Sequence, residues 1–137
     1  MCKRRNLEYS DGVSTERNLE KILSSNVDLS SDSYELHQRI TDWPSEYHLS
    51  TRRAQLLKGF DYDRSGNVLE IGCGCGAITR FLGERFDSVI SIEGSLTRAR
   101  LARKRTTDMD NVSILCAPFQ DLSFTIQFDI IFTYRFY

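Results

Sequence analysis

Three glycines at alternate positions constrain the fold of this chain more than any other feature. Residues 68–71 form a short aliphatic run typical of a buried strand, and residues 77–86 carry apolar side chains at helical spacing. Gly72, Gly74 and Gly76 lie between these two segments. Because glycine adopts positive φ angles and leaves space above its backbone, this pattern predicts a tight turn from a strand into a helix, against which a ligand can lie.

The segments that follow the glycines alternate between strand and helix. Apolar runs at residues 89–92, 112–115 and 128–132 read as strands, and Ser95 is placed to cap a helix over residues 96–104. Such alternation produces right-handed βαβ units and a parallel sheet. The sequence therefore predicts an α/β fold, namely a Rossmann-like three-layer α/β/α arrangement with a partial parallel sheet of about four strands.

Helices are expected before the glycine loop, over residues 15–23, 33–43 and 50–59. Ser14 or Thr15 is the expected N-cap of the first helix. The second helix carries an apolar stripe that ends at Trp43, and Pro44 is expected to end the helix. Trp43 is expected to be a core residue, with a platform for the substrate as the alternative.

We divide the chain into an N-terminal helical extension, residues 1–44, and a partial Rossmann-like domain, residues 45–137, that stops within the fourth strand. The polar residues 1–12 are expected to fray, and residues 61–66 to form a turn. A fourth strand at the end of the sheet is an exposed apolar edge, which favours self-association.

Composition excludes several classes of protein. The chain has 18 Lys and Arg against 19 Asp and Glu, a net charge of −1 that argues against a nucleic-acid binder. No run approaches the roughly 20 apolar residues of a membrane span, and no apolar stretch follows the basic residues 3–5 as in a secretion signal. Two of the four cysteines lie in Gly-Cys-Gly-Cys-Gly, too close together to join distant parts of a fold, so we expect a reduced, cytoplasmic protein. The cysteines also lack metal-site spacing, so no metal is expected.

Two acidic residues flank the glycine loop. Glu93 ends the second strand, 21 residues after Gly72, where a carboxylate can accept hydrogen bonds from ribose hydroxyls. At Glu70, a carboxylate repels a pyrophosphate but pairs with the ammonium of a methionine group. This favours S-adenosylmethionine. A dinucleotide is the alternative, because the glycines with Ala77 also satisfy the dinucleotide fingerprint. A third reading is a glycine turn that binds nothing, with Glu70 solvated.

At these residues the chain resembles the class I S-adenosylmethionine-dependent methyltransferases. The similarity spans about residues 45–135, and its motifs are residues 69–76, 92–95, 111–124 and 128–132. Residues 47–53 are also similar to bacterial methyltransferase domains found beside or fused to glycosyltransferases.

The resemblance implies roles for particular residues. Glu70 and the three glycines would hold the methionine part, Glu93 and Gly94 the ribose, and Phe119 the adenine. The chain departs from the family at residues 117–118, where an Asp is often found, and it lacks the family's last strands. We therefore expect a truncated or frameshifted product with weak or no activity.

No catalytic residue is assigned. The expected acceptor is a small molecule or a glycan precursor. His48 is a candidate base, with a surface or hydrogen-bonded histidine as the alternative, and the basic residues 98–105 are read as a solvated helix face or a phosphate or RNA contact. The competing functions are a non-catalytic Rossmann-like module that associates through its fourth strand, and a dinucleotide-dependent oxidoreductase.

Overall fold

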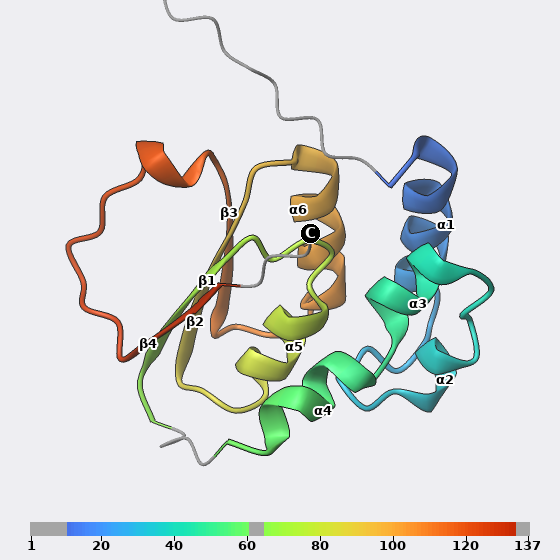
Figure 1. Ribbon diagram of the computed structural model, residues 1–137, viewed down its shortest axis with the longest axis horizontal. Helices are drawn as coiled ribbons and strands as arrows, with labels where there is room; N and C mark the ends of the chain where they lie inside the picture. The colour runs from blue at the N-terminus through green and yellow to red at the C-terminus, as the bar shows by residue number, and fades with distance from the viewer. Residues whose placement is uncertain (1–10, 61–64, 134–137) are drawn as a thin grey trace, which may run out of the picture.

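The four apolar runs form the strands of one parallel sheet in the computed structural model, which describes residues 11–60 and 65–133 (Figure 1). The strand order is β3-β2-β1-β4, with bounds β1 Asn67–Ile71, β2 Ser88–Glu93, β3 Val112–Cys116 and β4 Ile130–Thr133. The predicted strands are therefore confirmed, with small shifts of their ends. Predictions for residues 1–10, 61–64 and 134–137 lie outside the described residues.

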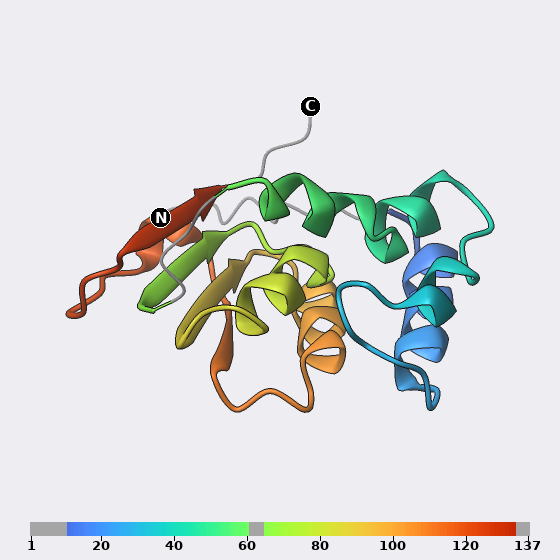
Figure 2. The ribbon, with the colours of Figure 1, turned by 90° about the horizontal axis from the view of Figure 1, so that it is seen from below.

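The first two crossovers of this sheet run in the same direction, from β1 to β2 and from β2 to β3, so their helices cover the same face. These helices are α5 Ala77–Gly83 and α6 Leu96–Arg105, and α4 Arg52–Lys58 packs beside α5 (Figures 1 and 2). On this face Val68 of β1, Val89 of β2 and Val112 of β3 are buried in one cluster with Phe81 of α5. The fold is the Rossmann-like α/β arrangement that the sequence predicts.

The other face of the sheet carries the remaining residues of the pleat. Leu69 of β1 is in register with Ile90 of β2 and Ile131 of β4. The turn η1 Phe119–Asp121 and its loop lie on this side, whereas the described α-helices lie on the opposite side (Figure 1). The described α-helices thus supply one of the two helical layers of the predicted arrangement. Ile131 is 58% exposed because β4 is an edge strand in the described sheet.

The N-terminal helices differ from prediction in two places. The first, α1 Val13–Ser24, has Gly12 as its N-cap and no side-chain cap, so neither Ser14 nor Thr15 caps it. The helix expected over residues 33–43 is instead two helices, α2 Tyr34–His37 and α3 Trp43–Leu49.

Pro44 lies in the first turn of α3 and does not end a helix. The Asp42 side chain accepts a hydrogen bond from the Ser45 N–H at 2.9 Å, and Ser45 closes the reciprocal half of this capping box. Proline suits the first turn of a helix because the N–H that it lacks has no partner within the helix there. This N-terminus turns Trp43 outward, where it is 70% exposed. Trp43 is therefore not the core residue that was predicted.

The N-terminal helices share a core with the glycine loop and α6. Leu19 of α1, Leu36 of α2 and Leu49 of α3 are buried in one cluster with Cys75 and Leu101. Residue 44, the predicted end of the N-terminal extension, lies inside α3. The proposed division into two domains stays a prediction.

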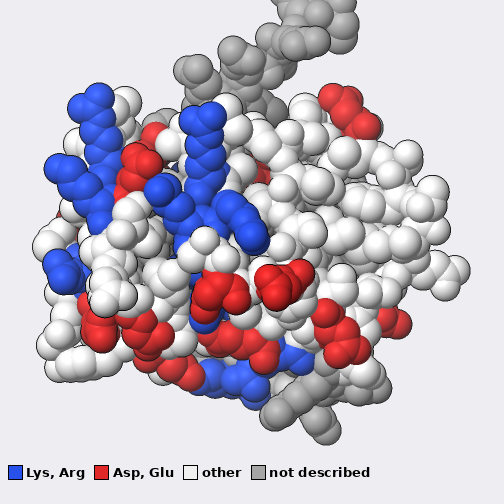
Figure 3. All heavy atoms as spheres, turned by 180° about the vertical axis from the view of Figure 1, so that it is seen from behind, with Lys and Arg blue, Asp and Glu red and all other residues white. Residues whose placement is uncertain are grey.

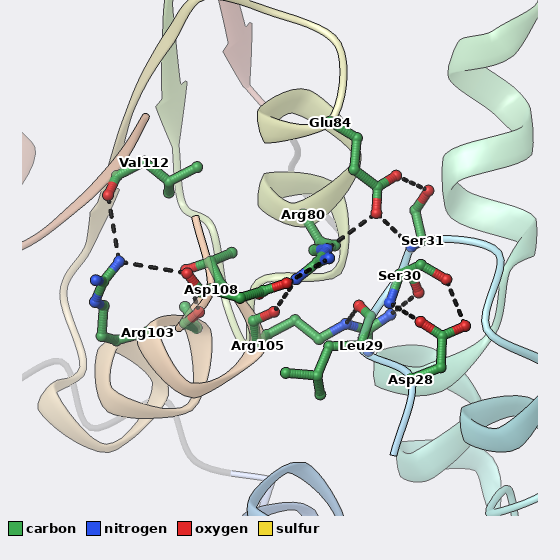
Figure 4. Close-up of polar contacts among 12 residues, drawn as sticks. Asp28, Leu29, Ser30, Ser31, Arg80, Glu84, Arg103, Arg105, Asp108 and Val112 are labelled. Carbon is green, nitrogen blue, oxygen red and sulfur yellow. Dashed lines mark hydrogen bonds and ion pairs between the residues drawn. The ribbon is translucent and has the colours of Figure 1, made fainter. Parts of the chain in front are cut away.

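Charged side chains also join the N-terminal part to the sheet domain (Figure 4). Arg105 donates through Nε to the Leu29 carbonyl at 3.0 Å and through Nη2 to the Ser30 carbonyl at 3.2 Å. Burial, together with the charge of Arg80, lowers the pKa of Arg105 to about 10. Arg80 in turn pairs with Glu84 and with Asp108.

The sequence predicted a solvated face for the basic helix α6. In the structure this helix is only partly solvated. Arg98 and Arg105 are buried, while Arg100 and Arg103 are exposed. Exposed Lys and Arg side chains gather over α1 and α6 (Figure 3). None of the described helices combines the length and the apolar character needed to cross a membrane.

Candidate functional site

The glycine loop connects β1 to α5 at the carboxyl edge of the sheet. Gly72, Gly74 and Gly76 have φ angles of +81°, +55° and +88°, a region that residues with a Cβ rarely adopt. The N–H groups of Gly72 and Cys73 donate to the Ile92 carbonyl at 2.9 and 3.1 Å. The loop is therefore held against the end of β2, and it makes the tight turn from strand to helix that the sequence pattern predicted.

The glycines of the loop have different structural roles. A Cβ on Gly76 would lie 2.8 Å from the Ala102 Cα of α6, so Gly76 allows the start of α5 to approach the α6 backbone. A Cβ on Gly74 would meet no atom within 4 Å, and the same holds for Gly94. Gly74 and Gly94 thus border open space above the loop and the end of β2.

Glu93 lies between these two glycines and is fixed by the backbone. Its Oε2 atom accepts a hydrogen bond from the Gly74 N–H at 2.8 Å, and its Oε1 atom accepts one from the Ser95 N–H at 2.9 Å. Each carboxylate oxygen can accept a second hydrogen bond. The arrangement therefore presents an anchored carboxylate beside open space, at the position that the sequence assigned to ribose recognition.

Glu70 lies beneath the loop and is 2% exposed. Its Oε2 atom accepts hydrogen bonds from Thr79 Oγ1 at 2.6 Å and from Ser91 Oγ at 2.7 Å. Burial raises the pKa of Glu70, and these hydrogen bonds partly offset the rise. The reading of Glu70 as a solvated residue is wrong, because β1, β2 and α5 enclose it. Its contact with a methionine ammonium stays a prediction.

The loop after β3 begins beside Glu93. The Ala117 N–H donates to the Glu93 carbonyl at 3.1 Å. Phe119 follows in η1 and is 47% exposed. The structure thus brings the ends of β1, β2 and β3 to one edge, whereas a contact between Phe119 and adenine stays a prediction.

A buried charge cluster behind the loop was missed by sequence reasoning. Asp11 Oδ2 accepts a hydrogen bond from Arg98 Nη2 at 2.6 Å and lies 2.8 Å from His48 Nε2. Cys75 Sγ of the glycine loop lies 3.9 Å from the same His48 nitrogen. Arg98, His48 and Asp11 come from α6, α3 and the residue before α1's N-cap, so no local sequence pattern could have joined them.

The sequence left two roles open for His48, a catalytic base or a surface or hydrogen-bonded histidine. In the structure His48 is a buried, hydrogen-bonded histidine. It is 3% exposed, which keeps it from contacting an acceptor directly. Burial lowers the pKa of His48, and the hydrogen bond with Asp11 offsets part of the effect. Burial also raises the pKa of Asp11, but His48 and Arg98 outweigh it and hold that pKa below its usual value.

The parallel sheet, the glycine turn and the acid that ends β2 together define a Rossmann-like domain, whose carboxyl edge is the candidate site for a nucleoside. A family model for a methyltransferase domain matches residues 68–137. The chain belongs to the class I S-adenosylmethionine-dependent methyltransferases.

A sequence match to an individual methyltransferase is consistent with this family. The chain is 36% identical over 66 residues to malonyl-[acyl-carrier protein] O-methyltransferase of Priestia megaterium, a match that covers 47% of this chain and 24% of that protein. The chain thus spans about a quarter of the length of this curated relative.

Solved structures support the fold. Phosphoethanolamine N-methyltransferase 1 of Haemonchus contortus, in complex with phosphoethanolamine and S-adenosylhomocysteine, is 21% identical with a TM-score of 0.57 over 88% of this chain and 24% of that chain. The complex of DhpI with S-adenosylhomocysteine is 23% identical with a TM-score of 0.54 over 87% of this chain and 52% of that chain.

Proposed function

We propose that this chain binds S-adenosylmethionine over the glycine loop and forms the cofactor-binding part of a methyltransferase. The observation that carries the proposal is the open space bordered by Gly74 and Gly94 beside the anchored carboxylate of Glu93. Glu93 would accept hydrogen bonds from the ribose hydroxyls, Gly94 would let the ribose approach, and Phe119 would wall the adenine. Gly72, Gly74 and Gly76 would shape the loop under the methionine part.

Charge at the site favours this cofactor over a dinucleotide. Glu70 and Glu93 are both acidic, and they flank the loop on which a pyrophosphate would have to lie. Two carboxylates disfavour a pyrophosphate and favour a ligand with a sulfonium and an ammonium group. We propose that Glu70 acts through this field, from below the loop, on the ammonium of the cofactor.

The residues of the chain would orient the cofactor for methyl transfer and exclude water from it. The cofactor, when bound, supplies a methyl group already activated by the sulfonium. The backbone of the loop and Glu93 would fix the nucleoside, and the apolar core behind Cys75 would exclude water from that side. We propose a small-molecule or glycan-precursor acceptor and a cytoplasmic protein.

Calorimetric titration with S-adenosylhomocysteine and with NAD tests the proposal. We expect the chain to bind S-adenosylhomocysteine and not NAD. Glu93→Ala should weaken binding about tenfold to a hundredfold, because hydrogen bonds to a charged group contribute about 1.5–3 kcal/mol each. Glu93→Gln, which keeps one acceptor oxygen, should lose less. The exposed Glu20→Ala is the control and should bind as the parent does. Binding of NAD in place of S-adenosylhomocysteine would contradict the proposal.

The exposed edge of the sheet supports a second candidate property, self-association through β4. Ile131 is 58% exposed on this edge strand of the described sheet. Unpaired strand edges that carry apolar side chains add further strands readily. Sedimentation analysis over a range of concentrations should show oligomers that Ile131→Lys reduces, and a monomer at every concentration would contradict this role.

A further inference from the structure

The helices α1 and α6 lie side by side and run in the same direction (Figure 1). Arg98 Nη2, in the first turn of α6, donates to Oδ2 of Asp11, which directly precedes the N-cap of α1, at 2.6 Å. Lys104 Nζ, in the last turn of α6, donates to Oγ of Ser24, the last residue of α1, at 2.9 Å. Matching turns of the two helices are therefore neighbours, and together they form one face of the molecule.

Cations occupy this face on both helices. Arg17 and Lys21 are exposed on α1, and Arg100 and Lys104 follow the same spacing on α6, where Arg100 is exposed and the Lys104 side chain is 39% exposed. Residues four apart lie about 6 Å from each other along a helix. Exposed Lys and Arg side chains gather over these two helices in one view of the surface (Figure 3). These four cations form the α1–α6 basic face.

Carboxylates of the described residues leave most of this charge without an ion pair. Lys104 Nζ lies 3.8 Å from Glu20 Oε1. Over residues 11–60 and 65–133, no carboxylate comes within ion-pair distance of Arg17, Lys21 or Arg100. The helix dipole favours cations in a last turn, but Arg17 and Arg100 lie in the middle of their helices. This charge therefore faces solvent without a structural role in the fold.

The basic face begins at the edge of the sheet that carries the candidate site. Helix α6 starts directly after Ser95, whose N–H donates to Glu93 Oε1 at 2.9 Å. At this end the first residues of the two helices, Val13 and Leu96, are exposed apolar side chains. Protein interfaces combine apolar contacts with a polar rim. The face therefore has both elements of a surface for another protein.

The residues of the face favour an acidic protein over a nucleic acid. Neither α1 nor α6 contains an aromatic residue on which a base could stack. Glu20 lies among the cations, and the chain has a net charge of −1, so a continuous row of phosphates meets repulsion. Carboxylates one turn apart on the helix of another protein match the spacing of the cations, and Glu20 repels a carboxylate that is out of register.

We propose that the α1–α6 basic face docks an acidic α-helix of a partner protein, whose carboxylates pair with the cations of the two helices. The partner would then lie beside the carboxyl edge of the sheet. This inference goes beyond the proposed function and does not depend on it, because the surface lies outside the glycine loop and needs no bound cofactor.

A synthetic helical peptide tests this docking surface. The probe is an alanine-based helix whose glutamates lie on one face, three or four residues apart, and a second peptide has the same composition with the glutamates spread around the helix. Fluorescence anisotropy at about 0.1 M salt, where charges farther apart than about 10 Å are screened, should detect binding of the first peptide. The double variant Arg17→Glu, Arg100→Glu should bind it about tenfold more weakly or worse.

The double variant Arg39→Glu, Arg52→Glu is the matched control, because it changes the net charge equally at exposed positions outside the face, and it should bind nearly as the parent does. Urea unfolding checks that each variant keeps its fold. The milder Arg17→Gln, Arg100→Gln should lose less affinity than the reversal, and it takes its place if the reversed chain does not fold.

Three results would overturn the proposal: no binding of the peptide to the parent, equal binding of the second peptide, or equal loss in the control variant. Tighter binding of a duplex RNA, or of vesicles of phosphatidylglycerol, than of the peptide would also overturn it, because the face would then serve a nucleic acid or a membrane.

Discussion

Gly74 and Gly76 lie two residues apart in one loop, yet alanine at each position should have a different main effect. At Gly76 it should lower the stability of the fold, and at Gly74 it should lower the affinity for the cofactor. In Gly76→Ala the new Cβ would lie 2.8 Å from the Ala102 Cα, and the residue would keep a φ of +88°. The strained backbone costs about 1–3 kcal/mol, and overlap with a packed backbone costs about 1–3 kcal/mol more. We expect Gly76→Ala to lose about 2–6 kcal/mol of unfolding free energy.

Gly74→Ala should be much less destabilising. Its φ of +55° lies in the left-handed well, and no atom lies within 4 Å of the added Cβ. The expected loss of unfolding free energy is about 1 kcal/mol. The methyl group would instead occupy the space proposed for the cofactor, so affinity for S-adenosylhomocysteine should fall about tenfold or more.

Urea unfolding followed by circular dichroism measures the first effect, and calorimetric titration with S-adenosylhomocysteine measures the second. The reasoning fails if Gly76→Ala unfolds with the parent. It also fails if Gly74→Ala binds the ligand as the parent does, because the open space above Gly74 would then not hold the cofactor.

Three further predictions concern the rest of the chain. Arg105→Met should destabilise the fold by about 2–4 kcal/mol in urea unfolding, because it leaves two part-buried carbonyl groups without this donor; a loss under 1 kcal/mol would contradict the role of this arginine. Trp43→Ala should cost about 1 kcal/mol in the same assay, since the ring is 70% exposed and stacks on Tyr47, whereas a loss of about 3–5 kcal/mol would restore it as a core residue. The pKa of His48 in the folded chain lies below 6.5, the value of an unperturbed histidine. Between these two pKa values the unfolded chain binds more protons than the folded chain, so the free energy of unfolding should fall as the pH decreases below 6.5. His48→Gln should reduce this dependence in unfolding experiments at several pH values, while the exposed His37→Gln should leave it intact.

Local patterns were sufficient for the sheet and the loop. Aliphatic runs of four to six residues define strands because a central parallel strand is buried on both faces, and this requirement is met residue by residue. The cap of α6 at Ser95 was predictable for the same reason, since its side chain bonds an N–H only three residues on.

The prediction of a single helix over residues 33–43 was wrong because two local signals compete near Pro44. An apolar stripe extended through Trp43 and favoured one long helix, but the Asp42–Ser45 capping box stabilises a new helix start at the same place. Helical periodicity does not show which of two such signals prevails, because packing against the core decides it.

The sequence by itself determined the parallel sheet, the glycine turn and the acid that ends β2, because each depends on backbone conformation and on neighbours a few residues away. Only the tertiary structure decided which charges are buried. Asp11 meets Arg98 across 87 residues, and Glu70 lies beneath the loop between Thr79 and Ser91. Such pairs form when separate elements pack, since burial of a charged group is tolerated only where the fold supplies a partner.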